Sequence, residues 1–122
     1  GDSVEIWAPN QSPDWLITGV SEYLKIPKAN VTVNTYFMGG SFGRTAYFDY
    51  VMEAVHLSRL VKAPVKVTWT REDDITQGPY RPGMLNVLRG GLDASGKVIA
   101  FEHKVVGESI QGQTGNKDMS KT

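Results

Sequence analysis

The chain has 122 residues, and its 13 basic and 13 acidic side chains cancel to a net charge near zero. This length suits one ordinary domain, and the balanced charge excludes the broad positive field that non-specific nucleic-acid binding requires. The absence of cysteine excludes disulfides, thiolate zinc sites and an iron–sulfur cluster bound by this chain. Apolar runs are far shorter than the roughly 20 residues that cross a bilayer, so no membrane span is expected. The compartment, cytoplasmic or periplasmic, is left open.

The first part of the chain predicts strands and helices in alternation. Val4–Ala8 alternates apolar and polar residues, as a half-buried strand does. A helix is expected to begin at Ser12–Asp14, where a hydroxyl cap precedes a proline in the first turn, and to end before Pro27. The β-branched stretch Val31–Phe37 predicts a second strand.

A glycine-rich segment then leads into a predicted helix over residues 45–62. On one face of this helix, the small side chains of Ala54 and Ser58 would permit close approach to a sheet. Three more strands and a polar loop are predicted after it, with the strands over 65–70, 85–91 and 98–106 and the loop over 71–83. The turn Asp93–Lys97 joins the last two strands as a hairpin.

This order of elements, β-α-β-α-β-β-β, predicts an α+β fold. A two-layer sandwich satisfies it, with a mixed sheet of about five strands and two helices on one face. Residues 107–122 are almost all polar or glycine, which predicts a flexible polar tail. The domain is therefore expected to span residues 1–106.

The segment Met38–Arg44 is the first candidate site. It joins a predicted strand to a predicted helix and contains Gly39, Gly40 and Gly43. Glycine permits positive φ and lets backbone amides approach a ligand, and a helix start adds unpaired amides with a partial positive charge. Arg44 adds a cation with a bidentate fork. These features indicate a site for an anion or an oxo group. An ordinary structural turn remains the alternative, because the segment lacks the sequence patterns of P-loops and dinucleotide-binding turns.

Longer strings around this segment carry a resemblance to a known family. Met38–Arg44, MGGSFGR, is similar to the G-G-G-F-G loop of the xanthine dehydrogenase and aldehyde oxidase family. Ile6–Pro13, IWAPNQSP, resembles a W-A-P-T-Q segment of that family, and Pro64–Ile75, PVKVTWTREDDI, resembles its P-V-K-V-x-W-T-R-E-D-D stretch. Tyr80–Pro82 matches the Y-R-P that follows. The matches keep the family's order over about residues 4–106.

The resemblance implies a cofactor for the glycine loop. In the family, the loop lies against molybdenum held by a pterin dithiolene. By its matched strings, the chain resembles a fragment of the molybdopterin-binding large subunit of this family, closest to the isoquinoline 1-oxidoreductase beta subunit. The residues expected to line the cofactor are Gly39, Gly40, Ser41, Phe42, Gly43 and Arg44. The cofactor is expected to be molybdopterin in a dinucleotide form, bound by the full-length protein and not stably by the fragment.

The implied reaction hydroxylates an electron-poor carbon of an N-heterocycle or an aldehyde with oxygen from water. The expected partners are the remainder of the large subunit and a [2Fe-2S] subunit that accepts the electrons. No residue here matches the family's catalytic glutamate, so the fragment alone is expected to be inactive. Arg81 is a candidate substrate contact.

Three positions depart from the family pattern. Ser41 replaces the third glycine of the loop, and Asn10 replaces a threonine. Ala46 stands where xanthine-oxidising members carry a substrate-binding glutamate, which argues against purine substrates.

Two other kinds of function stay open. The glycine loop suits a non-catalytic domain that binds phosphate or a small anion. Apolar residues around Phe37, Met38 and Phe42 suit an assembly module that is covered by a partner. Neither the two histidines nor the acidic residues 72–74 have the spacing of a metal site, so no metal is expected to bind directly to this chain.

Overall fold

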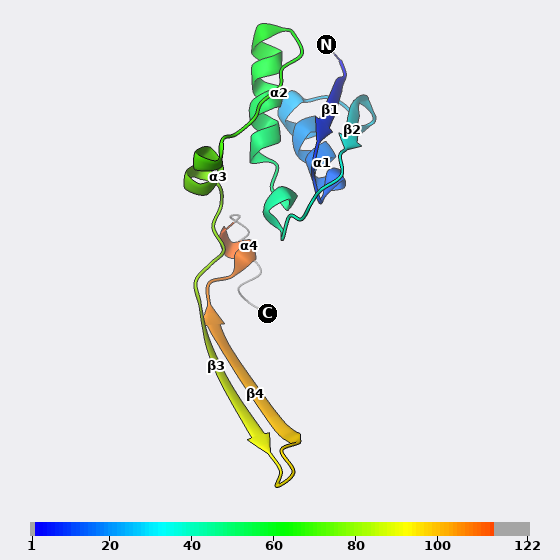
Figure 1. Cartoon of the computed structure of the whole chain (residues 1–122). Helices are drawn as coiled ribbons and strands as arrows, with labels where there is room; N and C mark the ends of the chain where they lie inside the picture. The colour runs from blue at the N-terminus through cyan, green and yellow to red at the C-terminus, as the bar shows by residue number, and fades with distance from the viewer. Residues whose placement is uncertain (1, 114–122) are drawn as a thin grey trace. The chain divides into compact units, whose positions relative to one another are not determined.

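A computed structural model describes residues 2–113, and the chain divides into two compact units, Gly1–Gly78 and Pro79–Thr122. Strands, helices and two short 3-10 turns alternate along the first unit, which contains β1 (Val4–Ala8), α1 (Pro13–Leu24), a turn at Lys28–Asn30, β2 (Val31–Thr35), a turn at Arg44–Ala46, α2 (Asp49–Val61) and α3 (Arg71–Gln77). The second unit contains β3 (Met84–Leu92), β4 (Val98–Gly107) and α4 (Ile110–Gln113) (Figure 1).

Strands β1 and β2 pair in parallel and are connected through α1. Their register runs from Val4 opposite Val31 to Ala8 opposite Thr35. Helix α1 begins at Pro13, as the sequence predicts, but the hydroxyl of Ser12 makes no capping bond. The backbone N–H of Ser12 instead donates to Oδ1 of Asn10 at 2.7 Å.

One apolar core joins both strands to α1 and α2. Alternation along β1 turns Ile6 and Ala8 into this core, where they are buried with Leu16, Val20, Val31, Val51 and Val55. Each Leu, Ile or Val side chain removed from water in this way contributes about 1.5–3 kcal/mol. Gly19 permits close packing of the segment before α2, because a Cβ at residue 19 would lie 2.7 Å from the ring of Phe48. The two helices are thus held on the strand pair by side chains from all four elements.

The structure corrects three expectations for the middle of the chain. Helix α2 begins at Asp49 rather than residue 45, because Arg44–Ala46 forms a separate 3-10 turn. Residues 65–70 form no strand, since no ladder joins them to another segment of the described chain. The single mixed sheet of about five strands is therefore not confirmed, and the fold is mixed α/β with two separate two-stranded sheets, β1–β2 and β3–β4.

The predicted polar loop contains the short helix α3, which a reciprocal cap stabilises. Oγ1 of Thr70 accepts a hydrogen bond from the N–H of Asp73 at 3.1 Å, and the N–H of Thr70 donates to Oδ2 of Asp73 at 3.0 Å. The N–H and the hydroxyl of Thr70 both donate to Oδ2 of Asp73, and these two hydrogen bonds hold the pKa of Asp73 below its ordinary value. A threonine followed three residues later by an acid is a known helix-start signal, so the sequence did contain the information for this helix.

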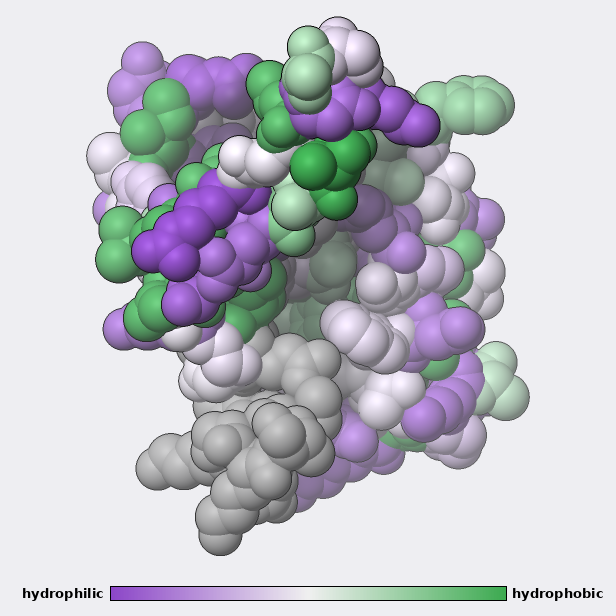
Figure 2. Space-filling view, turned by 90° about the horizontal axis from the view of Figure 1, so that it is seen from below, coloured by the Kyte–Doolittle hydropathy of each residue, from purple (hydrophilic) through white to green (hydrophobic). Residues whose placement is uncertain are grey.

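The second unit contains the predicted hairpin, confirmed to within one residue at each strand end. Strands β3 and β4 pair antiparallel from Met84 opposite Gly107 to Leu92 opposite Val98. Large apolar side chains on this hairpin are exposed, including Leu88 at 61% and Phe101 at 70%. On the face of the molecule seen in Figure 2, hydrophobic residues lie at the surface among hydrophilic ones.

Helix α4 lies in the segment for which the sequence predicts a flexible tail, and residues 114–122 of that tail lie outside the described part. None of the described helices combines the length and the apolar character that a membrane crossing requires.

Candidate functional site

The glycine loop after β2 has an unusual backbone. Gly40, Phe42 and Gly43 have positive φ angles of 129°, 49° and 89°. For the non-glycine Phe42, this left-handed conformation costs on the order of 1 kcal/mol. A Cβ on Gly40 would lie 3.2 Å from the ring of Phe42. Glycine at position 40 therefore lets the chain reverse tightly while the aromatic ring folds back beside it.

The amides of the loop fall into two groups. The N–H of Gly43 donates to Oε1 of Gln11 at 3.0 Å, the N–H of residue 44 donates to the carbonyl of Ser41 at 2.8 Å, and the N–H of residue 45 donates to Oγ of Ser41 at 3.2 Å. Within residues 2–113, no hydrogen bond engages the amides of Gly39 and Gly40. The second half of the loop is therefore held internally, whereas the backbone donors of its first half have no partner within residues 2–113.

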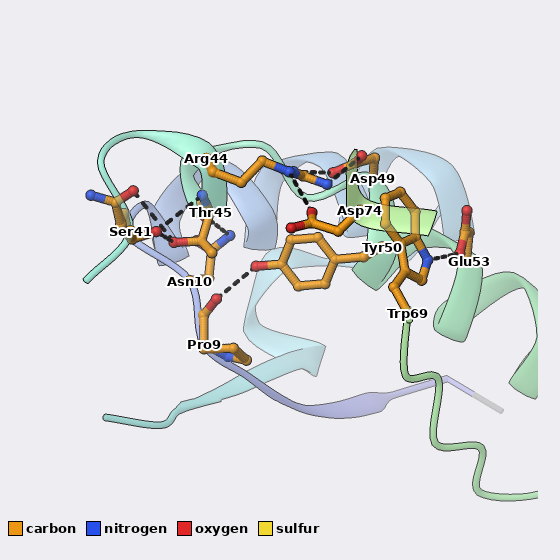
Figure 3. A network of polar contacts seen from close by, with 11 residues as sticks. Pro9, Asn10, Ser41, Arg44, Thr45, Asp49, Tyr50, Glu53, Trp69 and Asp74 are labelled. Atoms are coloured by element: carbon orange, nitrogen blue, oxygen red, sulfur yellow. Dashed lines mark hydrogen bonds and ion pairs between the residues drawn. The ribbon is translucent and has the colours of Figure 1, made fainter. Parts of the chain in front are cut away.

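Asn10 and Gln11 hold this loop from the segment after β1. Asn10 is only 1% exposed, and its Nδ2 donates to the carbonyl of Thr45 at 2.7 Å (Figure 3). Its Oδ1 accepts from the N–H of Ser12. The N–H of Gln11 donates to the same Thr45 carbonyl at 3.1 Å. The sequence singled out this segment only through its family resemblance. Its role as an anchor for the loop depends on contacts over 35 residues, which local patterns do not show.

Arg44 connects the loop to α2 and α3. Its two terminal nitrogens donate to both carboxylate oxygens of Asp49 at 2.9 and 3.0 Å. Its Nε lies 3.4 Å from Oδ1 of Asp74, close enough for ion pairing but not aligned for a hydrogen bond. The guanidinium carbon also lies 5.5 Å from the ring centre of Tyr50 and 5.4 Å from that of Trp69, within cation–π range (Figure 3). Arg44 is thus engaged on several sides by this chain itself.

The environment fixes the protonation states of Arg44 and Tyr50. Burial acts to lower the pKa of Arg44, but the hydrogen bond and charge of Asp49, together with Asp74, outweigh it and raise the pKa above its ordinary value. Burial raises the pKa of Tyr50, an effect that Asn10 and the charge of Arg44 only partly offset. Tyr50 therefore remains a neutral phenol at physiological pH, and it donates to the carbonyl of Pro9 at 2.6 Å.

Replacing Tyr50 with phenylalanine is expected to lower the free energy of unfolding by about 1 kcal/mol, because one partly buried hydrogen bond is lost while the ring is kept. Tyr47→Phe is the matched control, since no hydrogen bond of the Tyr47 hydroxyl is present in the described chain. Guanidinium unfolding followed by tryptophan fluorescence measures the stability of both variants. The signal reports on the first unit, because all three tryptophans lie before residue 79. Equal effects of the two variants would contradict a role for the Tyr50 hydroxyl.

A cleft of about 470 Å³ opens beside the loop. Its walls include Gly40, Ser41, Phe42, Arg44, Trp69 and Arg71. The Phe42 residue is 90% exposed, and a Cβ placed on Gly39 would have no protein atom within 4 Å. The side chain of Arg71 is 77% exposed, although its Nη1 lies 3.7 Å from Asp74. The cleft thus brings together the backbone of Gly40, an aromatic surface and a cation.

The structure does not bring every predicted site residue into this cleft, since Gly39 and Gly43 are not among the residues that line it. Arg81 lies in the second unit, and its role as a substrate contact stays a prediction. In the described chain, His, Asp and Glu residues form no cluster of three or more that could hold a metal ion. The chemistry that this site can support is therefore recognition of a group with oxygen acceptors and a flat or apolar part, by residues 39–44.

Comparison with known proteins decides the family. Residues 1–115 match the model of the molybdopterin cofactor-binding domain. The chain belongs to this family. The match confirms the resemblance that the loop and its flanking strings indicate, and it extends over nearly all of the described residues.

Relatives of this molybdopterin cofactor-binding domain are subunits of larger oxidoreductases. The chain is 34% identical over 116 residues to the aldehyde oxidoreductase molybdenum-binding subunit PaoC of Escherichia coli, covering 93% of this chain and 16% of that protein. It is 30% identical over 108 residues to the beta subunit of isoquinoline 1-oxidoreductase from Brevundimonas diminuta, covering 88% and 14%. It is 31% identical over 99 residues to one of the subunits of nicotinate dehydrogenase from Pseudomonas putida, covering 81% and 8%. The chain thus spans less than a fifth of the length of these relatives.

Proposed function

We propose that this chain forms one wall of the molybdopterin site in the large subunit of a molybdenum hydroxylase. The observation that carries the proposal is the pair of amides at Gly39 and Gly40, which no group within residues 2–113 engages, beside the exposed ring of Phe42. A pterin with its molybdenum group presents both oxygen acceptors and a flat surface, which suit these donors and this ring. The full-length protein is proposed to oxidise N-heterocycles or aldehydes, the classes named for the relatives above.

The residues of the glycine loop have different proposed roles. The amides of Gly39 and Gly40 donate to oxygen atoms of the cofactor, and Phe42 provides an apolar wall that limits water. Ser41 and Gly43 shape the loop between them, since both are engaged by bonds that fix the backbone. Arg44 stays a proposed cofactor residue, but its contacts with Asp49 and Asp74 make support of the loop its first role. The cofactor, when bound, supplies the two-electron oxidation in which the substrate gains oxygen from water.

The rest of the active site is proposed to come from other parts of the protein. These are the remainder of the large subunit, which supplies the catalytic base, and a [2Fe-2S] subunit that removes the electrons. Arg81 is retained as a proposed substrate contact. The larger mixed sheet expected from the sequence is likewise a proposal for the full-length protein, where further segments are available to extend the two small sheets.

A test of the cofactor wall uses Gly39→Val in the full-length protein, purified with its iron–sulfur partner. No protein atom lies within 4 Å of a Cβ at residue 39 and its φ is not positive, so the substitution leaves this chain's own packing intact. A cofactor that approaches the amide would meet the new side chain. We expect at least a ~10-fold fall in molybdenum content, measured by mass spectrometry, with an unchanged melting temperature of the cofactor-free protein.

Gly83→Val is the matched control, because residue 83 also has open space and no positive φ and lies outside the loop. Wild-type molybdenum content in Gly39→Val would argue against the proposal.

The alternative, a non-catalytic anion-binding domain, is favoured by the exposed Arg71 at the edge of the same cleft. It predicts that inorganic phosphate stabilises the chain and that Arg71→Ala abolishes this effect. The cofactor wall predicts that phosphate at millimolar concentration leaves the melting temperature unchanged.

A further inference from the structure

Strand β1 has one edge that no strand of the described chain covers. The carbonyl of Ala8 accepts from the N–H of Tyr36 at 3.4 Å, and the register pairs Ile6 with Val33. Consecutive residues of a strand direct their backbone groups to opposite edges. Ile6 and Ala8 therefore bond to β2, whereas the N–H and C=O groups of Glu5 and Trp7 point to the other edge. Unpaired backbone groups in such a row are a template for another strand.

This open edge lies along a groove of about 620 Å³. The backbone of β1 forms one wall, and residues 64–67 form the opposite wall. The floor consists of one face of α2, with the side chains Val51, Ala54, Val55 and Ser58. Val51 and Val55 are almost fully buried, at 3% and 6% exposure, so this floor is continuous with the core.

The floor has the character of a helix face that packs on a sheet. The sequence predicts that Ala54 and Ser58 permit close approach to a sheet, and these small side chains line the groove. The segment Val65–Val67 on the far side alternates apolar and polar residues like a strand, yet it has no ladder partner in the described chain. A two-stranded sheet is marginally stable by itself. The layer above α2 therefore has room for sheet that the described chain does not provide.

We propose that the groove receives one further β-strand, contributed by a segment of the full-length large subunit outside these 122 residues. The added strand pairs with Glu5 and Trp7 along the open edge of β1, and it covers Ala54 and Ser58 with its own small or β-branched side chains. This proposal rests on the proposed function only in assuming a large subunit. The large subunit is the expected source of the strand because this chain covers only 16% of the E. coli relative, and most of such a protein therefore lies outside these 122 residues. The described chain already forms both walls of the groove, so only the strand between them is lacking.

The first test is hydrogen exchange at single-residue resolution in the full-length protein. The amides of Ile6 and Ala8 bond to β2 and serve as the internal reference. We expect the amides of Glu5 and Trp7 to exchange at least ~100-fold more slowly than free peptide, as in a strand paired on both edges. Rapid exchange at Glu5 and Trp7 with protection at Ile6 and Ala8 would show an open edge and overturn the proposal.

The second test identifies the occupant. A photo-reactive benzoylphenylalanine is incorporated in place of Lys66, an exposed residue on the far wall of the groove. After irradiation, we expect peptide mass spectrometry to find cross-links to a segment of the large subunit outside residues 1–122. Three outcomes would each overturn the proposal: cross-links that stay within residues 1–122, cross-links to a second copy of the chain, and cross-links to the iron–sulfur subunit. Both experiments are carried out on protein with and without molybdenum cofactor. Failure of the added-strand proposal can then be distinguished from failure of the proposed cofactor site.

Discussion

Replacing Asn10 with alanine is expected to lower the free energy of unfolding by about 2–4 kcal/mol, since two hydrogen bonds of a buried side chain are lost. Asn10 is 1% exposed and links the carbonyl of Thr45 to the N–H of Ser12. Its loss leaves the Ser12 N–H unpaired at the start of α1 and frees the end of the glycine loop. Guanidinium unfolding followed by tryptophan fluorescence measures the change.

Two further variants at this position separate the hydrogen bonds from the volume of the side chain. Asn10→Thr restores the residue that the family usually has there, and its hydroxyl can keep one of the two bonds, so about half of the loss should be recovered. Asn10→Asp keeps the shape but has no donor for the Thr45 carbonyl and buries a charge, so it should be at least as damaging as alanine. A neutral effect of Asn10→Ala would show that the loop is held by other contacts.

Replacing Arg44 with alanine is the second change with a large expected effect. It removes two charge-assisted hydrogen bonds to Asp49 and leaves Asp49 and Asp74 without the cation that they share. We expect the free energy of unfolding to fall by about 2–3 kcal/mol, as for hydrogen bonds to charged groups that are partly buried. The same unfolding experiment measures it.

Lysine at position 44 separates charge from shape. Arg44→Lys keeps the positive charge but loses the bidentate fork and the flat contact with the rings of Tyr50 and Trp69. It should therefore be intermediate between wild type and alanine. The double variant Arg44→Ala with Asp49→Asn should be less destabilised than the sum of the two single variants. Strict additivity would contradict the ion pair.

The local elements of this fold could be predicted well from sequence. Alternation indicated β1 and β2, the turn Asp93–Lys97 indicated the hairpin, and Pro13 marked the start of α1, because these signals lie within or next to the element they define. The short helix α3 was missed although Thr70 and Asp73 form a capping box there, since a run of charged residues also suits a loop. Residues 65–70 have the composition of a strand, but a strand also needs a neighbour, which composition does not reveal.

Only part of the candidate site could be predicted from the sequence. Glycine spacing indicated the loop, and the longer strings indicated the family, which the comparisons confirm. The contacts that hold the loop were not predictable, because Asn10 lies 35 residues from Thr45 and Asp74 lies 30 residues from Arg44 along the chain. The distinction between the amides of Gly39 and Gly40, which nothing in residues 2–113 engages, and the engaged amide of Gly43 likewise required coordinates.

The exposed hairpin has a consequence for how the protein matures in the cell. Met84, Leu88, Phe101 and Val105 lie on one face of it by alternation, while Arg89 and Glu102 pair on the other at 3.1 Å. Until those apolar side chains are covered, a newly made chain resembles a client for chaperones and proteases. Degradation of unassembled subunits should therefore start near residues 79–107, which would couple the abundance of this polypeptide to the supply of its neighbours.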